Sequence, residues 1–190
     1  MRTRGRLLCR SYRGMPYRWN TIGIDSYFSA LSPLVFPEFE LFTSVTTIGS
    51  SATTVNSGFA AKQIKIKLPN SITTLRQKVF TSSNFYAQDQ LVVPANNISS
   101  EGAFSTITTL TDIVFTAATF TNLKGYALFN NTTANLVFPN ATAAPPAGNN
   151  FGSFKGYIYV PDALVDAWKA VSGWSALTSR ILPLSEWTTQ

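Results

Sequence analysis

Side chains that could do acid–base or nucleophilic chemistry are few in this 190-residue chain, and they are scattered along it. There is no histidine, which is the commonest general base and a frequent metal ligand. The single cysteine, Cys9, has no base beside it, so a nucleophilic role has little support. Of the candidate acids, Asp162 and Asp166 are expected as charges at a helix start. Asp89 and Glu101 are isolated on expected turns, which leaves Asp112. We therefore expect no enzymatic activity, no metal site and no cofactor.

The first 20 residues concentrate the positive charge of the chain. They hold six of its 15 basic residues and none of its nine acids, so the rest of the chain is formally neutral. A basic arm on a neutral body indicates attachment to an anionic partner. Its aromatic residues could stack on a nucleic acid, or they could fill pockets of a neighbouring protein, which is the interpretation we favour. The candidate anchoring residues are Arg2, Arg4, Arg6, Arg10, Arg13 and Arg18 with Tyr12, Tyr17 and Trp19.

Residues 21–41 are apolar and aromatic, and Pro33 and Pro37 prevent a long helix there. A linker, a strand added to a partner sheet and an N-terminal cap all fit this segment. No apolar run in the chain approaches the roughly 20 residues that a membrane helix needs. Leu7-Leu8-Cys9 is too short for the apolar region of a secretory signal, so we expect neither a membrane span nor a signal peptide.

Residues 42–160 repeat one pattern, in which a short apolar strand ends before Pro or Thr and a Phe follows a polar turn. The residues before that Pro or Thr are at positions 42, 68, 93, 115, 138 and 160, so the steps are 26, 25, 22, 23 and 22 residues. A repeat of this length predicts a solenoid, whose units are stable only when stacked. The phenylalanines expected to form an internal ladder are Phe80, Phe104, Phe129 and Phe154.

Two segments of this region have a distinct local pattern. Gln63 to Leu68 alternates polar and apolar residues, which predicts a half-buried strand. Residues 141–150 are rich in Ala, Pro, Gly and Asn, which predicts an exposed loop that tolerates change. That loop could contact a partner or could be a plain connector.

Residues 161–190 are expected to form a helical cap over the open end of the stack. Asp162 after Pro161 marks a helix start, and Gly173 marks its end. Trp168 and Trp174 could bind carbohydrate, but their helical spacing favours packing against the core. The residues assigned to the cap are Leu164, Trp168, Val171 and Trp174.

These repeats resemble the BspA-like leucine-rich repeat family. Leu68-Pro69-Asn70-Ser71-Ile72-Thr73-Thr74-Leu75 is similar to the family phrase strand-Pro-x-Ser-(Val/Ile)-Thr-x-(Ile/Leu), and Gly102-Ala103-Phe104 is similar to its Ala-Phe position. Tyr157-Ile158-Tyr159-Val160-Pro161, together with Trp168, Trp174-Ser175 and Ile181, is similar to its C-terminal unit. The resemblance covers residues 42–183, with departures at Thr43 and Thr116, which replace Pro, and at Pro145-Pro146.

The resemblance implies a mainly β, leucine-rich-repeat-like solenoid used for binding, with a C-terminal capping helix and an extended N-terminal arm. Bacterial members of the family are typically secreted or surface-attached, and similar modules occur on virion proteins of tailed phages. We therefore expect a bacteriophage virion protein, such as a head fibre, a capsid-decorating protein or a tail protein. Residues 1–41 would attach it to other virion proteins, and the repeats would project, possible ligands being a host surface glycan or protein.

We also expect this virion protein to be a homo-oligomer. Two other functions fit the sequence. One is a nucleic-acid-binding protein that uses the arginine-rich arm, whose binding would be steeply salt-dependent. The other is a bacterial surface adhesin with a mis-called start codon, for which a signal sequence would lie upstream in the genome.

Overall fold

A computed structural model gives the fold of the chain. It describes residues 21–22, 36–40, 46–48, 63–76, 84–85, 90–98, 103–123, 129–147 and 151–188. The predicted basic arm, residues 1–20, and the predicted ladder residue Phe80 lie outside the described residues. The described residues form a mixed α/β structure of parallel sheets and a few short helices.

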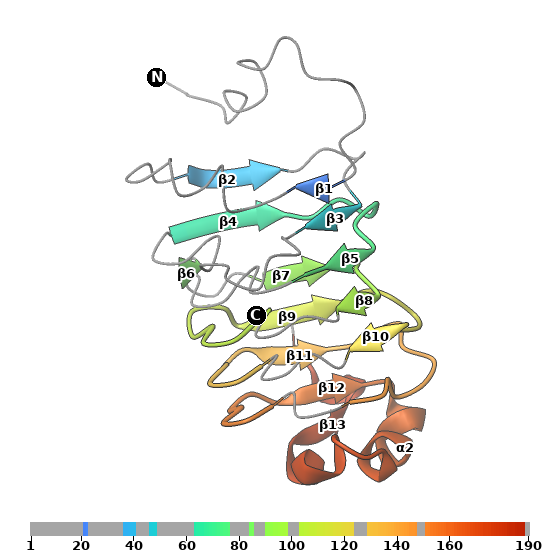
Figure 1. Cartoon of the computed structure of the whole chain (residues 1–190). Helices are drawn as coiled ribbons and strands as arrows, with labels where there is room; N and C mark the ends of the chain where they lie inside the picture. Colours follow the sequence, from blue (N-terminus) through green and yellow to red (C-terminus); the bar gives the residue numbers. More distant parts are fainter. Residues whose placement is uncertain are drawn as a thin grey trace.

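The longest strands form two parallel sheets that Figure 1 shows one above the other. One sheet has three strands: β2 (Phe36–Glu40), β4 (Gln63–Lys67) and β6 (Asn84–Phe85). The other, which we call the long-strand sheet, has five: β7 (Gln90–Val93), β9 (Asp112–Phe115), β11 (Asn135–Val137), β12 (Ile158–Val160) and β13 (Ile181–Pro183). Within it each strand pairs with the next along the chain.

A further sheet of two-residue strands runs beside them (Figure 1). Its members are β1 (Thr21–Ile22), β3 (Thr47–Ile48), β5 (Thr74–Leu75), β8 (Asn97–Ile98) and β10 (Asn122–Leu123). All their pairings are parallel, and the aliphatic residue is fully buried in β5, β8 and β10. β1 and β2 thus place parts of residues 21–41 as paired strands within these sheets.

Backbone hydrogen bonds connect each turn of the chain to the one after it. The carbonyl oxygen of Thr73 accepts from the backbone N–H groups of Asn96 and Asn97, at 3.2 and 3.0 Å. The carbonyl oxygen of Asn96 in turn accepts from Thr121 and Asn122, at 3.0 and 3.3 Å. This repeated backbone bond joins successive turns in the same register.

Two lines of aromatic rings run through the core. In the first, Phe104 stacks on Phe129 with ring centroids 5.6 Å apart, and Phe129 meets Phe154 edge-on at 6.4 Å. These are three of the four residues of the predicted ladder. In the second, which the sequence analysis missed, Phe115 stacks on Phe138 at 4.8 Å. Phe115 and Phe138 each directly precede the Thr or Pro of a repeat. The sequence predicted only a strand end at these two positions.

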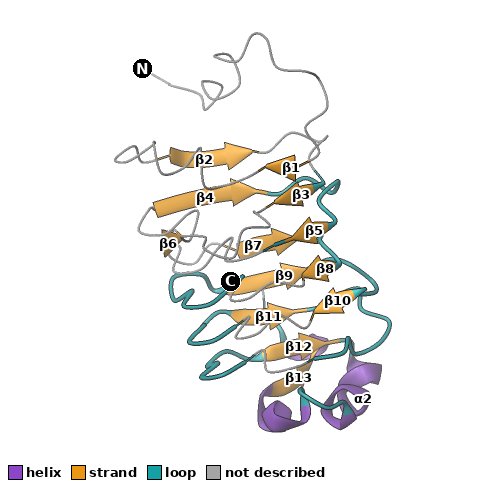
Figure 2. Ribbon diagram, in the orientation of Figure 1, coloured by secondary structure: helices purple, strands orange, loops and turns teal. Residues whose placement is uncertain are grey.

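The C-terminal cap is made of short helices, which lie beside β13 at the end of the stack in Figure 2. They are η2 (Asp162–Leu164), α2 (Val165–Ala170), η3 (Ser175–Arg180) and η4 (Leu184–Glu186). The prediction of one helix from Asp162 to Gly173 is wrong, because the α-helix ends at Ala170 and Val171 is extended, with φ −77° and ψ 132°. Trp168 and Trp174 pack against each other, 4.6 Å between ring centroids. Six residues of continuous helix would turn Trp174 well away from Trp168, so the chain must leave the helix between them.

The segment predicted to be an exposed, tolerant loop is docked on this cap. The carbonyl oxygen of Pro145 accepts a hydrogen bond from Trp174 Nε1 at 2.7 Å, and both residues are buried. Ala147 lies so close to Gly173 that a Cβ at position 173 would be 2.8 Å from its methyl carbon. The prediction of exposure is therefore wrong for Ala141 and Pro145, although Thr142, Ala143 and Pro146 are exposed.

Candidate functional site: the outer face of the long-strand sheet

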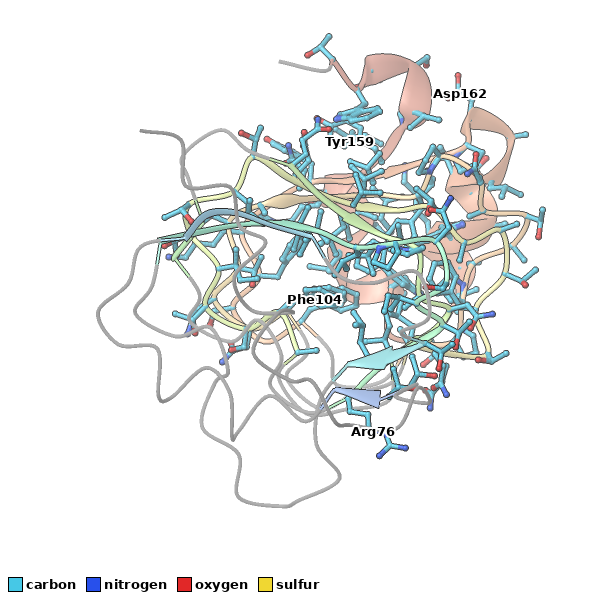
Figure 3. The ribbon with its side chains drawn as sticks, turned by 90° about the horizontal axis from the view of Figure 1, so that it is seen from above. Arg76, Phe104, Tyr159 and Asp162 are labelled. Carbon is cyan, nitrogen blue, oxygen red and sulfur yellow. The ribbon has the colours of Figure 1, made fainter. Side chains whose placement is uncertain are left out.

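The long-strand sheet has a core face and an outer face, because successive side chains of a strand point to opposite sides. Ile113 and Phe115 of β9 point into the core, so Asp112 and Val114 point outward. Figure 3 looks down the stack and places Phe104 and Tyr159 on opposite sides of the strands. The outer face carries two columns of side chains that the strand register brings together.

The polar column starts each strand, or directly precedes it. Its members are Gln90, Asp112, Asn135 and Tyr157. Gln90 Nε2 donates to Asp112 Oδ2 at 2.9 Å, and Asn135 Nδ2 donates to Asp112 Oδ1 at 3.0 Å. Asn135 Oδ1 then accepts from the backbone N–H of Tyr157 at 3.1 Å. Asp112 is only 1% exposed, so these hydrogen bonds from side-chain amides replace the hydrogen bonds to water that a buried carboxylate loses.

The apolar column lies two residues further along each strand. Its members, in register, are Val92, Val114, Val137, Tyr159 and Leu182. Val92 at one end is 44% exposed, whereas Val114 is 7% and Val137 is 0% exposed. Neither Val114 nor Val137 belongs to the buried core cluster on the other side of the strands. Part of the molecule must therefore cover the outer face over β9 and β11 but not over β7.

The chain that follows β13 returns to this face, and we call residues 184–188 the strap. Its helix η4 packs against β12. The backbone N–H of Ser185 donates to Asp162 Oδ1 at 3.0 Å, which ties the strap to the turn after β12. Hydrogen bonds from the Ser185 side chain and backbone lower the pKa of Asp162. Trp187 Nε1 is buried and has no hydrogen-bond partner among the described residues.

The electrostatics of Tyr159 agree with a strap near the outer face. Burial is the largest cause of the raised pKa of its phenol, and the nearby Asp112, Tyr157 and Glu186 also raise it. Asp112 and Tyr157 come from the polar column, while Glu186 comes from the strap. Tyr159 therefore lies where both columns and the strap approach one another.

The residues assigned to the cap lie together at the end of the stack. Trp168 and Trp174 are fully buried, and Leu164 and Val171 are partly buried against the same core. The buried indoles leave no ring face on which a sugar could stack. The signal for their position was present in the sequence as apolar spacing, but their contacts with Phe138 and Phe151 were not.

The candidate acids do not form a catalytic group in the part of the chain that the structure describes. Asp112 is held by two amides, Asp162 is bonded to the strap, and Asp166 is exposed in the first turn of α2. Asp89, Glu101 and all nine arm residues proposed as anchors lie outside the described residues. Over the described ranges, no three metal-ligating side chains come together. In the same ranges no helix combines the length and the apolar character of a membrane-spanning segment.

Comparison with known proteins identifies no matching family model and no matching curated protein.

Proposed function

We propose that this chain is a binding protein built on a BspA-like, leucine-rich-repeat solenoid. The observation that carries the proposal is the near-constant step between paired residues of the long-strand sheet. Asp112 lies 22 residues after Gln90, and Asn135 lies 23 residues after Asp112. A stack of such turns forms one long sheet face, the kind of surface that repeat proteins commonly use for binding.

The proposed setting of this binding protein is a bacteriophage virion. The arm, residues 1–20, carries six arginines and no acid, while residues 21–190 are formally neutral. Residues 1–41 would attach the chain to capsid or tail proteins, and the repeats would project as copies of a homo-oligomer toward a host surface glycan or protein. The support comes from this separation of charge and from the resemblance of the repeats to modules on phage particles.

Removal of one whole turn tests the solenoid. Deleting residues 112–134 joins Thr111 to Asn135 and leaves Asn135 in the register that Asp112 had with Gln90. Because each unit contacts only its neighbours, the shortened chain should still unfold cooperatively in urea. Deleting residues 112–122 is the control, because it removes β9 without removing a whole turn, so residues 123–134 no longer continue the repeat that precedes them. Equal behaviour of the two deletions would contradict a solenoid.

The virion role has a separate test. An antibody against residues 42–190 should label particles purified from cells that produce the chain, and brief trypsin treatment of the isolated chain should remove the arm first. Deleting residues 1–20 should abolish the association with particles. The opposite outcome is that the antibody finds the chain only apart from particles and that the chain binds heparin through the arm alone. That outcome would favour the nucleic-acid-binding function.

A further inference from the structure

We infer that the strap, residues 184–188, is a built-in occupant of a peptide-docking surface formed by the apolar column. The inference starts from three valines in register, Val92, Val114 and Val137. They share residue type, column and sheet face, yet their exposure falls from 44% to 7% and 0% along the stack. The cover therefore begins beyond β7 and is complete at β11.

The strap is the described segment in position to provide this cover. Its helix η4 contacts β12, which is the neighbour of β11 in the sheet. Its Ser185 is bonded to Asp162 beyond the end of β12, and its Glu186 lies near enough to Tyr159 to act on the phenol electrostatically. Tyr159 pairs in register with Val137, so these contacts hold the strap beside the fully covered part of the column.

Two features indicate that the strap is displaceable. The indole N–H of Trp187 is buried without an acceptor among the described residues, and such a donor costs free energy relative to its hydrated state. The bond that ties the strap, Ser185 to Asp162, is exposed, so water competes for both partners. An indole N–H without an acceptor among the described residues also occurs in the core, at Trp168, so the exposed bond is the feature that distinguishes the strap.

The chemistry of the strap defines the occupant that could replace it. It is a short peptide with aliphatic and aromatic side chains, like Leu184 and Trp187. In the strap, the helical turn η4 (Leu184–Glu186) precedes Trp187, whose backbone is extended at φ −77° and ψ 118°. Displacement would join Val114 and Val137 to the already exposed Val92 as one apolar strip. A role of the strap in regulating binding rests on the proposed binding function. The covering of Val137 by the strap does not depend on that function.

Thiol labelling tests the covering directly. In a chain with Cys9→Ser, Val137→Cys introduces a small apolar thiol under the strap, and Val92→Cys is the matched control at the exposed end of the same column. Deleting residues 184–190 should raise the maleimide labelling rate at position 137 at least about tenfold, as expected for loss of a local cover. The rate at position 92 should not change.

A synthetic peptide of residues 184–190 tests docking. Added to the truncated chain, it should slow labelling at position 137 again, and the same peptide with Trp187→Ala should not. Continued protection at position 137 after truncation, with a circular dichroism spectrum like that of the full chain, would overturn the covering by the strap. Fast labelling at position 137 after truncation that the peptide does not slow would overturn the docking surface. It would not bear on the virion role.

If the truncated chain does not fold, a pair of substitutions in the full chain replaces it. Asp162→Ala removes the acceptor for the Ser185 N–H, while Asp162→Asn keeps an oxygen at that place. Labelling at position 137 should be faster in the alanine variant than in the asparagine variant. Equal and slow labelling at position 137 in both variants, and also in a chain with Trp187→Ala, would overturn the proposal.

Discussion

The indole nitrogen of Trp174 donates a hydrogen bond to the carbonyl oxygen of Pro145 at 2.7 Å, although the two residues are 29 positions apart in the chain. Trp168, whose ring lies 4.6 Å from that of Trp174, is equally buried but has no acceptor for its indole among the described residues. Comparing the two tryptophans therefore separates the contribution of a buried hydrogen bond to stability from the contribution of a buried ring.

Trp174→Phe should lower the free energy of unfolding by about 1–3 kcal/mol more than Trp168→Phe, because only the first leaves a buried carbonyl unpaired. Both changes remove a comparable part of a buried indole. Urea denaturation of the two variants beside the unchanged chain measures the difference. Equal losses would show that the Pro145 bond contributes nothing to stability.

Phe115 lies where the two aromatic lines meet, and its ring contacts Phe104, Phe129 and Phe138. Phe115→Ala should cost about 3–5 kcal/mol, because it leaves a cavity in a close-packed core. Phe120, which is only partly buried beside it, is the matched control and should cost less when changed to Ala. Thermal unfolding followed by circular dichroism compares them, and equal shifts would argue against a continuous aromatic core.

Gly156 has no room for a side chain. A Cβ built there would overlap the carbonyl oxygen of Ala134, on the preceding turn, and would lie 2.8 Å from its carbonyl carbon. Gly156→Ala should therefore destabilise the fold by about 1–3 kcal/mol through overpacking. Lys155→Ala, an exposed neighbour, is the control for urea denaturation. A Gly156→Ala chain as stable as the control would mean that the two turns can move apart freely.

Tyr159 should make stability fall at alkaline pH. Its pKa is raised in the folded chain, chiefly by burial, so folding favours the neutral phenol. The resulting contribution is fully present below the ordinary value of 10.0 and is lost as the pH rises through the raised pKa. Melting temperatures from pH 8 to pH 11 should show a steeper decline in the unchanged chain than in Tyr159→Phe. Tyr157→Phe, at a 46% exposed position on the same face, should not remove that decline.

The sequence alone was sufficient to place most of the long strands. The residues before Pro or Thr at positions 93, 115 and 160 end β7, β9 and β12, and the alternation from Gln63 predicted β4. Strand ends and alternation are local properties, because a proline or a change in period acts on its own segment of backbone. The same reasoning identified Phe104, Phe129 and Phe154 as candidates for one line of rings.

Only the tertiary structure decided what lies beside what. The second line through Phe115 and Phe138, the docking of Pro145 on Trp174, and the end of α2 at Ala170 all depend on contacts between separate turns. The burial of Val137 on the outer face is the clearest case, because alternation predicts an exposed valine there. What covers a sheet face is determined by where a distant segment returns, and local pattern carries no information on that return.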